Sequence, residues 1–159
     1  ENFENITFKN MTVTNTSEYG DGIRMMNAKV ELMDVALKGC TDVGFYISNC
    51  TSENIVVATR CEFANSTYGA EARGSLTSAT FKNCVFKDNV NDGIQTDDNA
   101  TIHLHGEATA IYSNGRFGIY ACNSSKLLIH LPSDHNTVYN NTREDRQTMN
   151  GATITNVED

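Results

Sequence analysis

The stretch Asn83-Cys84-Val85-Phe86, followed by Asn91-Asp92-Gly93-Ile94, decides the fold because its pattern returns at a nearly constant interval. Arg60-Cys61-Glu62-Phe63 precedes it by 23 residues. The glycine of the second segment, Gly93, belongs to a series with intervals of 22, 25, 24 and 25 residues: Gly22, Gly44, Gly69, Gly93 and Gly118. Apolar pairs such as Ile102 and Leu104 keep the same period. Three short strands per repeat, each pointing alternate residues inward, predict a coil that stacks on itself.

We therefore expect an all-β solenoid of about six rungs, with 22–27 residues per rung. The expected rungs span 4–27, 28–49, 50–75, 76–99, 100–124 and 125–151, and residues 152–159 begin another. The length predicts a single domain over residues 1–159. A start at Glu1, without an initiator methionine, predicts a processed or excised part of a longer protein. The only proline and the polar run 140–146 predict an irregular loop over residues 132–150.

Asparagines recur shortly before the repeated glycines. They are Asn65, Asn89 and Asn114, with Asn15 and Asn140 at related positions. Asparagine tolerates left-handed backbone, and its amide bonds to neighbouring main chain. Stacked rung upon rung, these amides are expected to form a ladder that satisfies buried turn carbonyls.

Composition excludes several classes of function. The net charge of −8 argues against nucleic acid as the main partner. No apolar stretch approaches the roughly 20 residues that span a bilayer, so no membrane insertion is expected. The five cysteines lack metal-ligand spacing, and Cys61 and Cys84 hold the same inward position in adjacent rungs. We expect buried, reduced thiols.

The phrases Gly20-Asp21-Gly22-Ile23 and Asn91-Asp92-Gly93-Ile94, with the two cysteine-containing segments quoted above, resemble right-handed parallel β-helix repeats of the pectate-lyase-like superfamily. The resemblance covers about residues 4–130 and implies the fold. Characterised members are mostly polysaccharide lyases, glycoside hydrolases and uronate epimerases, so it also implies action on a polysaccharide. Of the polygalacturonase motifs, only an Asp-Asp pair is present, at Asp97-Asp98. No set of catalytic residues therefore carries over from the family.

The strand after each repeated glycine is expected to expose two columns of side chains. The first column is Arg24, Tyr46, Glu71, Gln95 and Tyr120, and the second is Met26, Ser48, Arg73, Asp97 and Cys122. Sugar rings stack on tyrosine, hydroxyl groups pair with carboxylates and amides, and arginine binds uronate carboxylates. The alternative is an ordinary polar sheet face, with tyrosines present for their strand propensity.

Two kinds of catalysis are compatible with these columns. Hydrolysis needs a protonated and an ionised carboxyl group, for which the candidates are Glu71 with Asp97, or Asp97 with Asp98. A lyase needs a base, for which Tyr46 and His103 are candidates, and a cation that neutralises the uronate, for which they are Arg24 and Arg73. The expected catalytic residues are Glu71, Asp97, Tyr46 and Arg73, and the expected substrate-binding residues are Arg24, Gln95, Tyr120 and Asp98.

No cofactor is predicted, although a divalent cation is compatible with the histidines. His103 and His105 are two residues apart on one strand, and His130 lies in the next rung. Two histidines at this spacing point the same way, so a metal site there is an open alternative to ordinary surface histidines.

The sequence therefore predicts a β-helix that engages, and by the resemblance degrades, cell-wall or capsular polysaccharide. The competing hypothesis is a non-catalytic carbohydrate-binding or structural stalk of a viral or microbial surface protein, as a homotrimer or stacked on the rest of a parent protein. Both imply an extracellular, cell-surface or virion location, which suits the many N-x-S/T sequons. Those sequons begin at Asn5, Asn10, Asn15, Asn49, Asn65, Asn99, Asn123 and Asn140.

Overall fold

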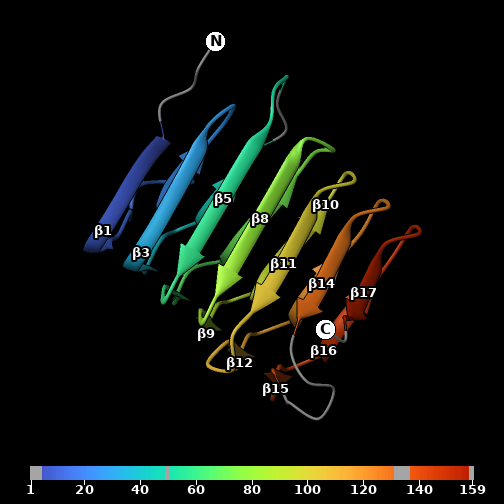
Figure 1. Cartoon of the computed structure of the whole chain (residues 1–159). Coiled ribbons are helices and arrows are strands. Elements are labelled where there is room, and N and C mark those ends of the chain that lie inside the picture. Colours follow the sequence, from blue (N-terminus) through green and yellow to red (C-terminus); the bar gives the residue numbers. More distant parts are fainter. Residues whose placement is uncertain (1–4, 49–50, 131–136, 158–159) are drawn as a thin grey trace.

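The computed structural model describes residues 5–48, 51–130 and 137–157. In these ranges the chain forms strands and no helix, and every strand pairs in parallel with its neighbours (Figure 1). Among these residues there is accordingly no helix that could span a membrane. Successive turns of the chain lie side by side along one axis, from β1 at one end to β17 at the other. The all-β solenoid of about six turns is confirmed.

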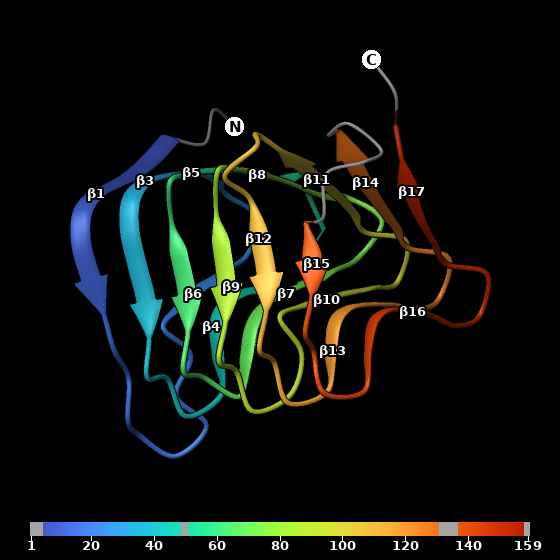
Figure 2. The ribbon, with the colours of Figure 1, turned by 90° about the horizontal axis from the view of Figure 1, so that it is seen from below.

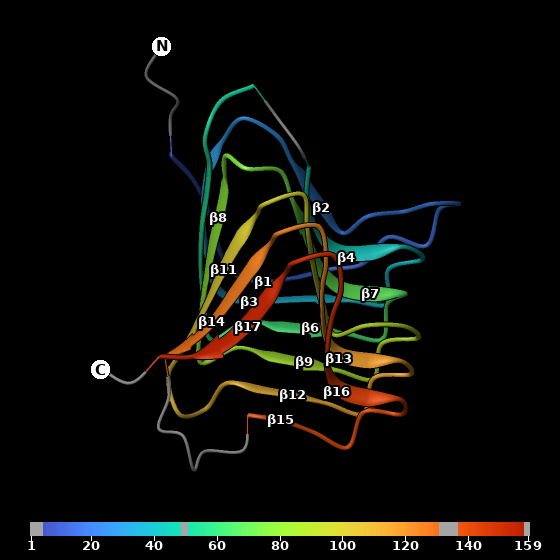
Figure 3. The ribbon, with the colours of Figure 1, turned by 90° about the vertical axis from the view of Figure 1, so that its right-hand side faces the viewer.

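Three faces enclose the core, as Figures 2 and 3 show. The first face holds β1 (Asn5–Val13), β3 (Lys29–Lys38), β5 (Asn54–Thr59), β8 (Thr77–Lys82), β11 (Thr101–His105), β14 (Lys126–His130) and β17 (Thr153–Asn156). The second face holds the ends of β1 and β3, then β6 (Glu62–Ala64), β9 (Val85–Lys87), β12 (Ala110–Tyr112) and β15 (Val138–Tyr139). The third face holds β2 (Ile23–Met25), β4 (Val43–Ile47), β7 (Tyr68–Arg73), β10 (Ile94–Asp97), β13 (Phe117–Ala121) and β16 (Glu144–Thr148). Because β1 and β3 run through two faces, the first and second faces form one continuous sheet.

The repeated glycines are required by close contact between rungs. A Cβ atom added to Gly44 would lie 2.6 Å from the carbonyl oxygen of Gly69 in the next rung. The backbone of each rung therefore passes too near its neighbour for a side chain at this position. Gly22 meets Gly44 in the same way, and Gly93 meets Gly118. This contact explains why glycine returns once per rung.

Stacked aromatic rings fill the core. The rings of Phe63 and Phe86, on adjacent rungs, are parallel with centroids 4.7 Å apart, and Phe81 meets both edge-on at 5.5 and 5.1 Å. Such pairs add to the stabilisation from burial alone. Cys61 and Cys84 are buried beside them, and all four described cysteines are free thiols, as expected. Cys50 lies outside the described residues.

The asparagine ladder is present, but two of its expected members were wrong by one residue. Asn114 Oδ1 accepts a hydrogen bond from Asn89 Nδ2, and Asn141 Oδ1 accepts one from Asn114 Nδ2, both at 2.9 Å. Asn65 and Asn140 instead occupy the preceding left-handed position, with φ of 53° and 55°. One rung before Asn89 the ladder position is taken by a serine hydroxyl.

Residues 137–150 are more regular than the loop predicted over 132–150. They contain β15 and β16, and β16 pairs in register with β13, from Phe117↔Glu144 to Ala121↔Thr148. In the sixth rung Asp145 stands at the register position of the repeated glycine, and Asn141 continues the ladder, with its amide donating to Ile111 O, Tyr139 O and Asp145 Oδ1. Residues 132–136 of the predicted loop lie outside the described residues.

Candidate functional site

The first predicted column exists on the third face, although Glu71, at 7% exposed, is buried where exposure was expected. The register pairs Arg24 with Tyr46, Tyr46 with Glu71, Glu71 with Gln95, and Gln95 with Tyr120. These five side chains therefore stand one above another along the rod. The column continues to Gln147 on β16. Gln147 was not predicted from the sequence because its strand has no preceding glycine.

The second column is mostly buried, which contradicts its expected exposure to solvent. Arg73 pairs with Asp97, as predicted, but the exposed fractions of Ser48, Asp97 and Cys122 are only 6%, 8% and 6%. Asp97 is the last residue of β10, and Ser48 and Cys122 come directly after β4 and β13. At this end of the strands, side chains bond to neighbouring rungs: the Ser48 and Cys122 side chains donate to Met25 O and Thr96 O. Asn123 in the next rung, for example, donates from Nδ2 to Asp97 Oδ1 at 2.8 Å.

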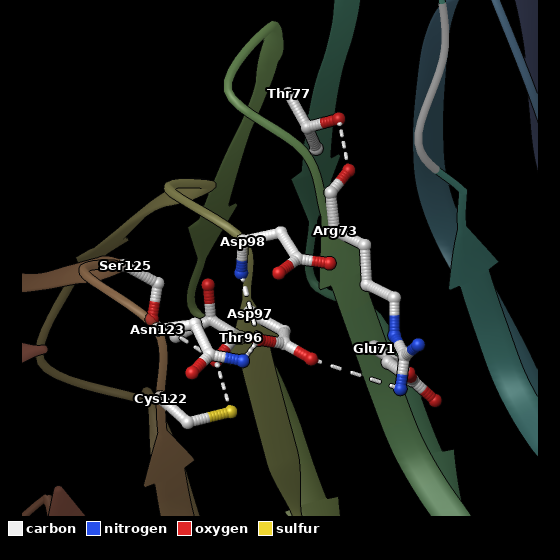
Figure 4. Close-up of polar contacts among 9 residues, drawn as sticks. All are labelled: Glu71, Arg73, Thr77, Thr96, Asp97, Asp98, Cys122, Asn123 and Ser125. Carbon is white, nitrogen blue, oxygen red and sulfur yellow. Dashed lines mark hydrogen bonds and ion pairs between the residues drawn. The ribbon is translucent and has the colours of Figure 1, made fainter. Parts of the chain in front are cut away.

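Arg73 joins two carboxyl groups from adjacent rungs (Figure 4). Its Nε lies 2.5 Å from Glu71 Oε1, and its Nη2 lies 3.8 Å from Asp97 Oδ2. Both carboxyl side chains are nearly buried, whereas 38% of the arginine side chain is exposed. The guanidinium group therefore covers the carboxyl groups and presents positive charge to solvent.

The two carboxyl groups differ in acidity. Burial raises the pKa of Glu71; the ion pair with Arg73 opposes this shift without cancelling it. Burial also acts to raise the pKa of Asp97, but hydrogen bonds from Cys122, Asn123 and the backbone N–H of Asp98, with the charge of Arg73, outweigh it and lower the pKa. The cluster thus places a carboxyl group that is easily protonated beside one that stays ionised.

A shallow hollow of about 220 Å³ opens beside this cluster, over β2, β4 and β7. It is lined by Asp21, Arg24, Asp42, Val43, Tyr46, Glu71 and Arg73. The guanidinium of Arg24 lies over the ring of Tyr46, 4.5 Å from its centroid, and is 3.3 Å from Asp21 Oδ2. Four of the eight predicted site residues therefore line one cavity. The loop between β1 and β2, which contains Asp21, extends outward next to β4 (Figure 3).

Asp21 and Asp42 are the acidic lining residues that were not among the predicted site residues. Burial, with a contribution from Asp21, raises the pKa of Asp42, and Asp42 in turn contributes to the raised pKa of Glu71. Each residue stands one or two positions before a repeated glycine, Gly22 or Gly44. An acidic residue at that point was the signal that could have identified them.

Residues 21–158 match the family model described as the right-handed β-helix region. The chain belongs to this family. The match covers most of the sequence and agrees with the resemblance to the pectate-lyase-like superfamily. No curated protein and no solved structure matches the chain. Membership in the right-handed β-helix family establishes the fold and leaves the activity to be inferred from the site.

The remaining predicted residues of this β-helix lie farther along the third face. Gln95 and Tyr120 continue the column beyond the hollow, and the Tyr120 hydroxyl donates to Met149 Sδ at 3.1 Å. Asp98 follows the end of β10, where its backbone N–H donates to Asp97 Oδ1 at 2.8 Å. These groups suit contacts with an extended ligand that reaches past the hollow.

His103 is not near this site. It lies on β11, in the first face, whereas Arg24 and Arg73 belong to the third. The structure therefore does not bring together the predicted pairing of a His103 base with an arginine that neutralises a uronate. His103 instead joins His105 and His130, with one ring nitrogen of each within 4.8 Å of the others. Burial, together with His130, lowers the pKa of His103.

Proposed function

We propose that the third face binds an acidic polysaccharide outside the cell and hydrolyses it. The observation that carries the proposal is the pairing of Glu71 and Asp97 on adjacent rungs, with pKa values shifted in opposite directions, beside an open hollow. In glycoside hydrolysis a protonated carboxylic acid protonates the leaving oxygen, and an ionised carboxylate activates water or attacks the sugar. Glu71 suits the first role and Asp97 the second.

The surroundings of the pair support an anionic sugar chain as the ligand. Arg24 and Arg73 line the hollow and would pair with uronate carboxylates. The ring of Tyr46 offers an apolar surface for a sugar ring, while Gln95 and Tyr120 extend the column along the rod. A hollow on a flat face admits the middle of a polymer as well as its end.

Arg73 has a particular role in this proposal. In the free protein its guanidinium group contacts both carboxyl groups. A uronate carboxylate of the ligand would compete for the same guanidinium and weaken its hold on Glu71. Because that ion pair lowers the pKa of Glu71, loosening it favours the protonated form that acid catalysis needs.

The test is the release of reducing ends from a panel of uronate-rich polymers. We expect Glu71→Gln and Asp97→Asn each to lower the rate by about 100-fold or more, because general acid–base catalysis contributes roughly 10²–10⁴. Glu62→Gln is the matched control, since Glu62 lies on β6 in the second face and pairs with Lys87. Unchanged rates in the first two variants would show that the pair is not catalytic. An unsaturated product absorbing in the ultraviolet would show lyase chemistry instead.

A non-catalytic binding role is the second candidate, and one observation favours it. Arg73 holds both carboxyl groups in a cluster that is nearly complete by itself, as a structural ion-pair network would be. In that case Arg24→Ala and Tyr46→Ala would weaken retention on an immobilised polymer, and no polymer would be cleaved. A trimer mass in solution would support the stalk form of this hypothesis.

A further inference from the structure

Three histidines gather on the first face, away from the third-face site. His103 and His105 lie two residues apart on β11. His105 pairs in register with His130 on β14, the next strand (Figure 1). The rings of His105 and His130 stack with centroids 4.1 Å apart, and those of His103 and His130 lie 5.2 Å apart. All three are half-buried. In-register stacking of two rungs thus assembles the cluster.

The spacing of the ring nitrogens is close to what a metal ion requires. Four-coordinate zinc binds histidine nitrogen at about 2.0–2.1 Å, which places two such nitrogens about 3.3 Å apart. His103 Nδ1 and His130 Nε2 are 3.0 Å apart, and one nitrogen from each of the three rings lies within 4.8 Å of the other two. To complete the set, side-chain rotations must close the widest gap by at most about 1.5 Å and turn the nearly parallel rings so that their nitrogens point at one ion.

We propose that His103, His105 and His130 bind a divalent transition-metal ion of the zinc class. Imidazole nitrogen is a preferred ligand of such ions, whereas calcium and magnesium take oxygen. Three histidine ligands leave the fourth position of a tetrahedral ion to water, which is the donor set of an open site rather than a closed structural one. The site is independent of the carboxyl pair on the third face.

The hydrogen bond between His103 and His130 specifies one change on binding. In that bond one ring nitrogen donates and the other accepts. If the ion occupies both nitrogens, the donor ring must carry its hydrogen on its other nitrogen. This requires a change of tautomer and no movement of the backbone.

The neighbours of the cluster supply both a modulator and a control. Lys82 stands beside His105 in register, on the side away from His130, and places a positive charge near the ion. Removing that charge should strengthen binding, because like charges repel. Thr80 stands beside His103 in the same way and carries a hydroxyl that is not needed as a ligand. Lys82→Gln and Thr80→Ala therefore probe the surroundings without removing a nitrogen.

The experiment is a titration of the chelator-treated, reduced protein with Zn²⁺ in competition with a chromophoric chelator. We expect one ion per chain. Loss of an outer-sphere partner typically costs roughly 10–100-fold in metal affinity, so loss of a ligand in His105→Ala should weaken binding by about 100-fold. Thr80→Ala should leave the affinity unchanged, and Lys82→Gln should raise it. Equal affinity in native protein and His105→Ala, or no binding at all, would overturn the proposal.

A second measurement on the native protein does not depend on the folding of any variant. The visible spectrum of bound Co²⁺ should show a four-coordinate ion without the charge-transfer band of a thiolate ligand. The described cysteines are buried, so they are not expected to supply a ligand. A strong thiolate band would assign the ion to a cysteine and refute the histidine site.

Discussion

Replacing Asn114 by alanine tests whether the amide ladder holds the rungs together. The side chain is fully buried and makes four hydrogen bonds. Its Oδ1 accepts from Asn89 Nδ2 at 2.9 Å and from the Asn89 backbone N–H at 3.2 Å. Its Nδ2 donates to Phe86 O at 3.2 Å and to Asn141 Oδ1 at 2.9 Å. The change therefore breaks contacts with the rungs on both sides.

The expected loss of stability depends on which hydrogen bonds the partners of Asn114 keep. Asn89 Nδ2 retains its bond to Phe63 O, and Asn141 Oδ1 retains the backbone N–H of residue 114. The backbone N–H of Asn89 loses the one acceptor that the structure assigns it. A buried donor left unsatisfied costs about 1–3 kcal/mol, and each other lost bond costs roughly 0.5–1.5 kcal/mol. Allowing for the partners' remaining bonds, we expect about 3 kcal/mol, or a fall in Tm of roughly 6–12 °C.

The assay is urea unfolding followed by circular dichroism, with Asn91→Ala as the matched control. Asn91 is half-buried, and its backbone N–H, which donates to Thr67 O at 2.8 Å, is unaffected by the substitution. The loss of unfolding free energy in Asn91→Ala should stay within about 0.5 kcal/mol, as for most surface changes. If Asn114→Ala cost no more than this control, the ladder would not stabilise the fold.

Three further outcomes follow from the packing and charges. Gly44→Ala should destabilise the protein by about 1–3 kcal/mol, because the new Cβ lies 2.6 Å from Gly69 O. Gly39→Asn should be tolerated far better in the same unfolding assay, because Gly39 has a left-handed φ of 68° that asparagine also adopts. The pKa of Glu71 in the folded protein is raised above its ordinary value of 4.5, so the folded state holds this proton more tightly than the unfolded state. The free energy of unfolding therefore falls as the pH rises from about 4.5 through the folded-state pKa. The stability of Glu71→Gln relative to the native protein should therefore increase with pH across that window in unfolding curves measured at each pH; a decrease would contradict the assigned direction. Arg60→Ala removes an exposed ion pair and should leave the unfolding midpoint unchanged within error.

The fold was predictable because each rung repeats one steric requirement. A glycine is needed wherever two backbones approach too closely for a Cβ atom. Contacts like that between Gly44 and Gly69 therefore require a glycine in the sequence once per turn. Alternation along each strand then assigned side chains to the core or to solvent. The column from Arg24 to Tyr120 followed from these two rules alone.

The errors arose where a rung bends. Alternation predicts which way Asp97 and Cys122 point, but contacts with neighbouring rungs at the strand ends decide their exposure. The ladder position likewise falls one residue after Asn65, in the turn beyond the strand. In the sixth rung Asp145 stands where earlier rungs have the repeated glycine, so a strand was mistaken for a loop. Local turn chemistry, and not strand periodicity, limited the prediction.

The three-sided coil restricts which residues can act together. Side chains on one face meet only if they occupy the same or nearby strand positions in consecutive rungs, because a packed core separates the faces. Glu71 and Asp97 satisfy this condition through Arg73, and so do His105 and His130. His103 and Arg73 do not, although His103 is only six residues from Asp97 in the sequence. In this fold, rung register is therefore the first condition that any catalytic or metal-binding set must meet, before residue chemistry is considered.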